Sequence, residues 1–330
     1  MDVLVKNPET IRGILHDDQV FSVERNPARV GNNNKLDAAK CPVKVLAHLG
    51  QGLARQRQET LYHEVKHLNS QNIEFIEKQW DDELNKIADQ LTRASVVYCR
   101  ERFIAILRQS FMHIYSIEPQ KIFVLEELSL LLQDYLSGAV DKDYSSELRA
   151  KASELIQAVP ITMRESLSRE EVEDAAINLG FLYFAAIDNT VSSLLATAHF
   201  QCKGLFDYGI DFRDLSLDSL ARICQPSVRI IARFCVQDTE INGQVFYKGD
   251  RAILSLMPTE IPLKTSSKED LMFGSGIHIC PGRKLVLMHT KYLVNGLHNL
   301  RKLFRIESFG VSEKNPYLAG LEELTIKKIA

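Results

Sequence analysis

The chain has 330 residues, of which 45% are hydrophobic and 25% are charged. This composition is that of a globular protein with a large buried core, and it excludes intrinsic disorder, collagen-like repeats and a disulfide scaffold. The 40 basic and 43 acidic residues nearly balance, so the overall charge gives no reason to expect a nucleic-acid partner.

The N-terminal residues lack a basic segment followed by a long apolar one, and no run of about 20 apolar residues suggests a membrane span. We therefore expect a soluble, cytoplasmic protein. The six cysteines are scattered without a Cys-x-x-Cys pair, a pattern typical of reduced thiols and one that argues against a zinc site. Five of them are expected to be packing residues: Cys41, Cys99, Cys202, Cys224 and Cys235.

Helical periodicity dominates the first two thirds of the chain. An Asn-Pro-Glu-Thr start predicts a short amphipathic helix from residue 7 to about 21, and the Gly, Pro and Asn residues of 26–52 predict a long loop. The spacing of apolar residues predicts further helices at about 53–68, 72–98, 101–115, 120–136 and 145–159.

The most apolar helix follows a capping box at Ser168, and we expect it to continue to about Phe200. A helix of this length, about 45 Å, that is apolar on most faces is expected to cross the middle of the molecule. After residue 229, β-branched and aromatic residues around an Asn-Gly turn predict a hairpin.

Residues 273–282 form a glycine-rich loop that leads into a predicted helix at about 283–300, and short strands are predicted at 303–329. The layout is mainly α with small β-sheets at the edges. We expect one domain over residues 1–330, with β-containing parts at about 1–25, 228–256 and 303–330.

The glycine-rich loop carries the chemistry. It reads Phe-Gly-Ser-Gly-Ile-His-Ile-Cys-Pro-Gly from Phe273 to Gly282, and its glycines let the backbone wrap closely around one side chain. Because Pro281 stands where a helix would start, Cys280 should face unpaired amides and the positive end of the helix dipole. Both favour the thiolate and should lower the cysteine pKa, which suits a permanent metal ligand.

These residues resemble the Phe-Gly-x-Gly-x-His-x-Cys-x-Gly haem-binding loop of soluble bacterial cytochrome P450 enzymes. The resemblance covers nearly the whole chain, at reduced length. It implies a P450-like fold with haem b between the central helix and the cysteine-loop helix, and Cys280 as the axial ligand of the iron. It also implies that Arg57, Arg233 and His278 neutralise the haem propionates. The remaining cofactor-binding residues that it implies are Phe273, Gly274, Gly282, Ala185 and Ala186.

Residues 185–190, Ala-Ala-Ile-Asp-Asn-Thr, resemble the family's central-helix motif, which delivers protons to bound dioxygen. Asp188 matches the acid of that motif, whereas Asn189 replaces the catalytic threonine and Ala186 replaces the kink glycine. An amide has no comparably acidic proton, and Thr190 should point about 100° round the helix. Because these residues occupy the positions of the family motif, the resemblance implies Asp188, Asn189 and Thr190 as the catalytic candidates.

Two other motifs depart from the family pattern. Leu53 replaces the histidine of the His-x-x-x-Arg helix that contains Arg57, and Ser219 replaces the glutamate of Glu-x-x-Arg, of which Arg222 remains. Residues 226–233 resemble the strand that enters the substrate pocket. The implied pocket residues are Val228, Arg229, Ile230 and Ile231. Arg229 is either an ion-pair partner within the fold or a pocket cation for an acidic substrate.

The first functional hypothesis is an oxidative tailoring enzyme of natural-product biosynthesis. A positive patch at Arg283, Lys284 and Lys291 would dock an acidic ferredoxin or flavodoxin as the electron donor. Asn189 suggests two alternatives, an oxygen-independent haem-thiolate isomerase or dehydratase and a peroxide-driven enzyme. The changes at Leu53 and Ser219 suggest a third, a haem-binding relative without catalytic activity.

Overall fold

The computed structural model describes residues 1–330 except 18, 23–61, 95, 137–144, 160–163, 166, 209–215, 217–229, 257–270, 277–278, 301, 312–320 and 330. The α-helices of the described part are α1 (Pro8–His16), α4 (Ser70–Arg93), α5 (Arg100–Ile114), α6 (Ile122–Leu136), α7 (Ser145–Glu154), α9 (Arg169–Phe184), α10 (Thr190–Tyr208) and α12 (Arg283–Leu300). A π-helical segment, η4 (Ala185–Asn189), joins α9 to α10, and short 3₁₀ turns are η2 (Pro119–Lys121) and η3 (Ile156–Ala158).

The strands form small sheets beside these helices. They are β1 (Asp2–Val5), β2 (Phe21–Ser22), β3 (Val96–Tyr98), β4 (Ile230–Cys235), β5 (Thr239–Ile241), β6 (Gln244–Phe246), β7 (Arg251–Ser255), β8 (Phe304–Val311) and β9 (Leu321–Lys328). One sheet has the order β1-β7-β4-β2, with β1 parallel to β7 and the other pairs antiparallel. A second has the order β3-β9-β8, and β5 pairs with β6. The predicted mainly α fold with small sheets is confirmed.

The predicted hairpin after residue 229 is confirmed for β5 and β6. Asn242 and Gly243 connect these strands with φ angles of 49° and 79°. Two consecutive positive φ angles are typical of the type I′ turn that matches the twist of a hairpin. The strand before them, β4, instead pairs with β7, which lies after the hairpin.

Three predicted helices need correction. The helix predicted at 72–98 ends at Arg93, and Val96–Tyr98 form β3, which pairs with the distant strand β9. The helix predicted from residue 7 to about 21 ends at His16. The central helix, predicted to end at about Phe200, continues to Tyr208, and the π-helical segment η4 lies within it between α9 and α10.

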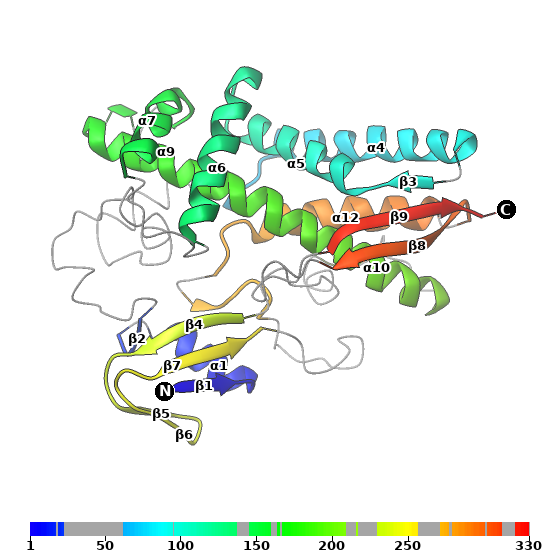
Figure 1. Ribbon diagram of the computed structural model, residues 1–330. Coiled ribbons are helices and arrows are strands. Elements are labelled where there is room, and N and C mark those ends of the chain that lie inside the picture. Colours follow the sequence, from blue (N-terminus) through cyan, green and yellow to red (C-terminus); the bar gives the residue numbers. More distant parts are fainter. Residues whose placement is uncertain are drawn as a thin grey trace.

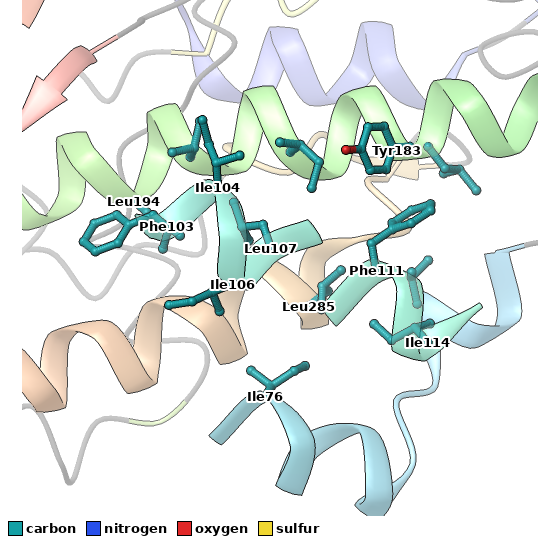
Figure 2. Close-up of a cluster of buried hydrophobic side chains, with 14 of the residues drawn as sticks. Ile76, Phe103, Ile104, Ile106, Leu107, Phe111, Ile114, Tyr183, Leu194 and Leu285 are labelled. Atoms are coloured by element: carbon teal, nitrogen blue, oxygen red, sulfur yellow. The ribbon is translucent and has the colours of Figure 1, made fainter. Parts of the chain in front are cut away.

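The larger hydrophobic cluster is built around α5. Figure 2 shows that Phe103, Ile106, Leu107 and Phe111 of α5 lie among side chains of the neighbouring helices. The neighbours labelled there come from α4 (Ile76), α9 (Tyr183), α10 (Leu194) and α12 (Leu285). Helices α4, α5, α9, α10 and α12 thus share one core, which holds the central helix and the helix after the cysteine loop in a common frame.

A second hydrophobic cluster lies under the four-stranded sheet. It joins β1, α1 and β4 to β7 through residues such as Ile14, Leu15, Cys235 and Leu254. In Figure 1 this sheet and α1 occupy one part of the molecule, and α4, α5, α9, α10 and α12 occupy the other. Leu271 belongs to the second cluster and Leu285 to the first, so the cysteine loop connects the two.

Within the described residues, the stretch Glu171–His199 is long and apolar enough to cross a membrane by length and composition. Most of its apolar window, 61%, is buried inside the protein. Such burial is typical of a central core helix, which is the role the sequence predicts for it.

Candidate functional site

The cysteine loop precedes α12, and hydrogen bonds within it fix its shape. The Cys280 N–H donates to the Phe273 carbonyl at 2.7 Å, and the Ile279 N–H donates to the Gly276 carbonyl at 3.3 Å. Gly274 and Gly276 have φ angles of 74° and 66°, a conformation that residues with a Cβ seldom adopt. The glycines therefore allow the tight loop that the sequence predicts.

The Cys280 thiol lies against the amide that begins the next helix. The backbone N–H of Gly282 hydrogen-bonds the thiol and lowers its pKa, but burial has the larger effect and raises the pKa overall. The prediction of a lowered pKa is therefore wrong for the chain by itself, because desolvation outweighs the amide and the helix dipole. A buried thiol becomes a thiolate when a metal cation binds it.

The predicted catalytic residues lie on the π-helical segment. Ile187 within it and Thr190 just after it are buried, whereas Ala185, Ala186, Asp188 and Asn189 are half-buried. The Oδ1 atom of Asn189 is buried and has no hydrogen-bond partner among the described residues. π-Helical turns inside α-helices are frequent at functional sites. The structure thus places an irregular backbone, and an amide oxygen that no described residue hydrogen-bonds, at the position that the sequence singled out.

Asp188 faces a group of charged side chains on α5. Burial raises the pKa of Asp188, and the positive charges of Arg100 and Arg108 act against that rise. Arg108 forms an ion pair of 2.8 Å with Glu126 of α6, and the Tyr183 hydroxyl donates to the same carboxylate at 3.5 Å. Burial raises the pKa of Tyr183 to about 12, and the nearby Asp188 charge makes a smaller contribution to that rise. These residues form a polar group between the half-exposed Arg108 and the central helix.

Arg233 on β4 is a buried cation. Its side chain donates from Nη1 to the Ala232 carbonyl at 2.8 Å, and burial lowers its pKa to about 10. Among the described residues no carboxylate forms an ion pair with it. A guanidinium in such a position is costly unless an anion neutralises it.

The predicted positive patch has structural contacts in addition to its charge. The Arg283 guanidinium lies 5.8 Å from the centre of the Phe273 ring, and Lys284 donates to the Leu68 carbonyl at 3.0 Å. Arg283, Lys284 and Lys291 are all half-buried rather than freely exposed. Two of the three therefore help to hold α12 against the loop and against the segment before α4.

Several predicted residues lie outside the described part of the chain. They are Arg57, His278, Val228, Arg229, Leu53, Ser219 and Arg222. Ile230 and Ile231 are described and are half-buried at the start of β4, three and two residues before Arg233. Phe273 is buried, and a Cβ on Gly282 would lie 3.8 Å from the Cys280 sulfur.

Two tyrosines near the site were not predicted from the sequence. Tyr62 is buried, and the charge of Cys280 contributes to raising the Tyr62 pKa after desolvation, which places this ring close to the thiol. Tyr183 connects to Asp188 as described above. The signal available for Tyr183 was a tyrosine within the most apolar helix, because a buried hydroxyl needs a hydrogen-bond partner.

Comparison with solved structures identifies the fold. P450BioI, solved with an acyl carrier protein that carries hexadec-9Z-enoic acid, matches with a TM-score of 0.72 at 16% identity, over 98% of this chain and 91% of that one. CYP109E1 from Bacillus megaterium, solved with testosterone, matches with a TM-score of 0.71 at 15% identity, over 99% and 92% of the two chains. HmtN, a post-tailoring hydroxylase of himastatin biosynthesis, gives 0.72 at 14% identity, over 99% and 90%.

The chain therefore has the cytochrome P450 fold over nearly its whole length. No protein-family model matches the sequence, and no curated protein matches it. A further match is a thermophilic cytochrome P450 from Sulfolobus tokodaii, with a TM-score of 0.67 at 17% identity, over 98% of this chain and 93% of that one.

Proposed function

We propose that this protein is a haem-thiolate oxidoreductase that oxidises a small organic molecule, with Cys280 as the axial ligand of a haem b iron. The observation that carries the proposal is the cysteine loop, in which the Phe273 carbonyl and the Gly282 amide hold Cys280 at the start of α12 within a cytochrome P450 fold. The loop presents one sulfur atom at the end of a rigid helix.

The described residues fit such a group in two independent ways. The enclosed Cys280 thiol would gain from a cation at the sulfur, because burial otherwise disfavours its charged form. The buried Arg233 would gain from an anion, and a haem propionate is a carboxylate that forms charge-assisted hydrogen bonds with a guanidinium. His278 and Arg57 are proposed as further propionate partners. The small residues Ala185 and Ala186, with Gly274 and Phe273, would line the macrocycle.

Haem ligated by a thiolate supplies redox chemistry and oxygen activation when it is bound. The chain's own contribution is then proton supply and substrate orientation. Burial raises the pKa of Asp188, so this carboxyl group holds its proton more tightly than an exposed aspartate does and is the candidate proton donor. We propose that Glu126, Arg108 and Tyr183 provide its connection to solvent.

Asn189 distinguishes this site from the family pattern. Its amide can donate and accept hydrogen bonds but does not supply a proton, and its buried Oδ1 has no hydrogen-bond partner in the part of the chain that the structure describes. We propose that Asn189 orients the substrate through a substrate hydroxyl or N–H group. Thr190 is buried and is a poor source of the missing alcohol function.

The substrate is proposed to be an intermediate of natural-product biosynthesis. This follows the solved relatives of the fold, among which HmtN is a post-tailoring hydroxylase of himastatin biosynthesis. Ile230 and Ile231, with Val228 and Arg229, would form an apolar pocket wall with one cation. We further propose one cytoplasmic domain over 1–330, with ferredoxin or flavodoxin docking near Arg283, Lys284 and Lys291.

A second candidate function is an oxygen-independent isomerase or dehydratase, which Asn189 favours because such a reaction needs no alcohol to deliver protons to dioxygen. The peroxide-driven alternative has the same motivation. Two experiments separate the oxidase function from the isomerase or dehydratase function. Product that requires NAD(P)H, dioxygen and a surrogate ferredoxin supports the first function, and product that forms anaerobically without reductant supports the second.

The haem assignment itself is tested by the reduced carbon-monoxide difference spectrum. The wild-type chain is expected to give the red-shifted Soret band of a thiolate-ligated haem, and Cys280→Ala is expected to lose it. Cys235→Ala, which removes a buried cysteine of the sheet cluster, is the matched control and should keep the band. A wild-type spectrum without the red shift would refute the role of Cys280.

A further inference from the structure

The end of helix α1 lies directly against the cysteine loop, although the two are separated by about 260 residues of chain. The His16 Nε2 and the Ser275 Oγ are 2.7 Å apart, within hydrogen-bond distance. His16 is in the last turn of α1, and Ser275 lies between the two positive-φ glycines of the loop. The contact joins an element of the sheet cluster to the loop that carries Cys280.

Gly276 adds a backbone contact at the same place. A Cβ on Gly276 would lie 2.8 Å from the Leu15 carbonyl oxygen and 3.3 Å from the His16 Cα. The loop backbone therefore approaches the α1 backbone as closely as glycine permits. A side chain at Gly276 would have to push the loop away from α1.

Helix α1 is itself firmly held, so it can act as a support. Ile11, Ile14 and Leu15 are each about 1% exposed in the sheet cluster. The Asp17 carbonyl accepts from the Phe21 N–H at 2.9 Å, and the Asp17 side chain accepts from the Val20 N–H at 3.1 Å. The end of α1 is thus fixed on both sides of His16.

Hydrogen bonds within the loop connect the segment that contacts α1 to Cys280. Ser275 and Gly276 lie five and four residues before Cys280, and the Ile279 N–H returns to the Gly276 carbonyl at 3.3 Å. The Cys280 N–H returns to the Phe273 carbonyl at 2.7 Å. A displacement of Ser275 and Gly276 from α1 would therefore move the backbone that carries the sulfur.

We propose that His16 is a positioning residue for Cys280. Its imidazole holds Ser275, and together with the Leu15 carbonyl against Gly276 it fixes the cysteine loop on α1. This inference rests on the proposed function only where it takes Cys280 as the iron ligand. The contact itself belongs to the chain and can be measured without haem.

The first experiment is amide hydrogen exchange of the loop segment 273–282 in the full-length, haem-free chain. His16→Ala and Ser275→Ala are each expected to speed exchange of this segment by about threefold to tenfold, the range that the loss of one hydrogen bond gives. The double variant should exchange no faster than either single variant, because both remove the same contact. His16→Gln, whose amide can still bond Ser275, should restore slow exchange.

Glu9→Gln is the matched control, because Glu9 is an exposed residue at the other end of α1. It should leave loop exchange unchanged. The inference is wrong if His16→Ala behaves like Glu9→Gln, or if the effects of His16→Ala and Ser275→Ala add. Gly276→Ala should speed exchange of the loop more than His16→Ala or Ser275→Ala does. If Gly276→Ala does not fold, the His16 and Ser275 variants still test the inference.

The second experiment uses the haem-loaded protein. In His16→Ala a larger share of the carbon-monoxide adduct should lose the red-shifted band. The midpoint potential of the haem should also differ from that of the wild type. His16→Gln should return both quantities toward their wild-type values. A wild type without that band would overturn the proposed function, while the exchange data would still test the loop contact. Altered exchange with an unchanged band and potential would restrict His16 to a structural role and overturn its assignment as a positioning residue.

Discussion

Trp80 of α4 donates a hydrogen bond from Nε1 to Nδ1 of His289 of α12 at a distance of 3.0 Å, and both side chains are fully buried. Because Nδ1 accepts this bond, the neutral imidazole carries its proton on Nε2. That atom is buried and has no hydrogen-bond partner among the described residues. Burial lowers the pKa of His289 to about 3. The contact orients two helices of the large core and makes that core sensitive to acid.

We predict that His289 makes the protein less stable as the pH falls below neutrality. Between its unfolded pKa of 6.5 and its folded pKa of about 3, the unfolded chain binds a proton at this ring and the folded chain does not. This histidine should therefore reduce the free energy of unfolding by about 1.4 kcal/mol for each pH unit below 6.5. Denaturant unfolding at pH 7.0, 6.0 and 5.0 measures the slope.

His289→Gln should flatten that slope, because its amide oxygen can still accept from Trp80 but does not titrate. The control is His63→Gln, which changes a histidine whose side chain is 64% exposed. It should leave the slope of the wild type intact. A His289→Gln protein that is as acid-sensitive as the wild type would contradict the assignment.

A second prediction concerns Arg233. Arg233 is buried and forms no ion pair with the described residues, so Arg233→Met should leave the haem-free chain equally stable or more stable, because the cost of desolvating the charge disappears. The same variant should bind haem more weakly by about tenfold to a hundredfold, because a propionate loses its partner. Thermal unfolding of haem-free protein and haem titration give the two values.

Arg251→Met provides the comparison for Arg233. Arg251 lies on the neighbouring strand β7 and forms an exposed ion pair with Asp2. Its loss should change haem affinity little. Equal effects of the two variants on haem affinity would show that Arg233 has no special part in binding.

A third prediction tests Asp188 together with the neighbouring polar side chain of Tyr183. Asp188→Asn should slow reductant consumption by about a hundredfold, in the range typical for loss of a general acid. Tyr183→Phe should slow it less, by about tenfold, and should increase the share of electrons recovered as hydrogen peroxide. Both quantities are measured with a surrogate electron donor.

Tyr292→Phe is the matched control for Tyr183→Phe. The Tyr292 hydroxyl donates to the exposed Glu77 side chain at 3.3 Å, away from the central helix. Its removal should alter neither the rate nor the peroxide yield. If Tyr183→Phe also changes neither the rate of reductant consumption nor the peroxide yield, proton supply does not depend on this tyrosine.

A fourth prediction concerns the crossing of α12 and α4. A Cβ on Gly296 would lie 1.9 Å from the Leu84 Cδ1, so Gly296→Ala should destabilise the fold by about 1–3 kcal/mol. Leu84→Ala should also destabilise it, because it leaves a cavity in the core. The double variant should lose less than the sum of the two, since the new methyl group enters the space that Leu84 left. Additive losses in denaturant unfolding would refute this close packing.

The sequence was sufficient to predict the structural elements that have a strong local sequence pattern. The helix predicted at 283–300 agrees with α12, because a proline and a glycine precede a long amphipathic repeat. The capping box at Ser168 is confirmed by reciprocal hydrogen bonds with Glu171. The cysteine loop was found because its residues are contiguous in sequence.

The sequence was insufficient to predict those features that depend on contacts between segments far apart in the chain. Val96–Tyr98 continue an apolar helical pattern, but they become a strand because β9, more than 220 residues later, supplies the hydrogen bonds. The contacts of Tyr183 with Glu126 and of His16 with Ser275 likewise depend on tertiary packing. The pKa of Cys280 was predicted in the wrong direction, because burial of the thiol is not visible in the local motif.

The π-helical segment Ala185–Asn189 also changes how the central helix can vary. One π turn contains one residue more than the α-helical turn it replaces, so every side chain after it is rotated by about 100° relative to an unbroken helix. Deleting a single residue here would return the helix to regular geometry. It would also leave the side chains of α10 facing α12 as they do now, because the residue removed is the extra one that the π turn holds. A difference of one residue in the length of this stretch is therefore compatible with the packing of the helix that follows, whereas straightening the segment without a deletion would turn all of α10 against α12.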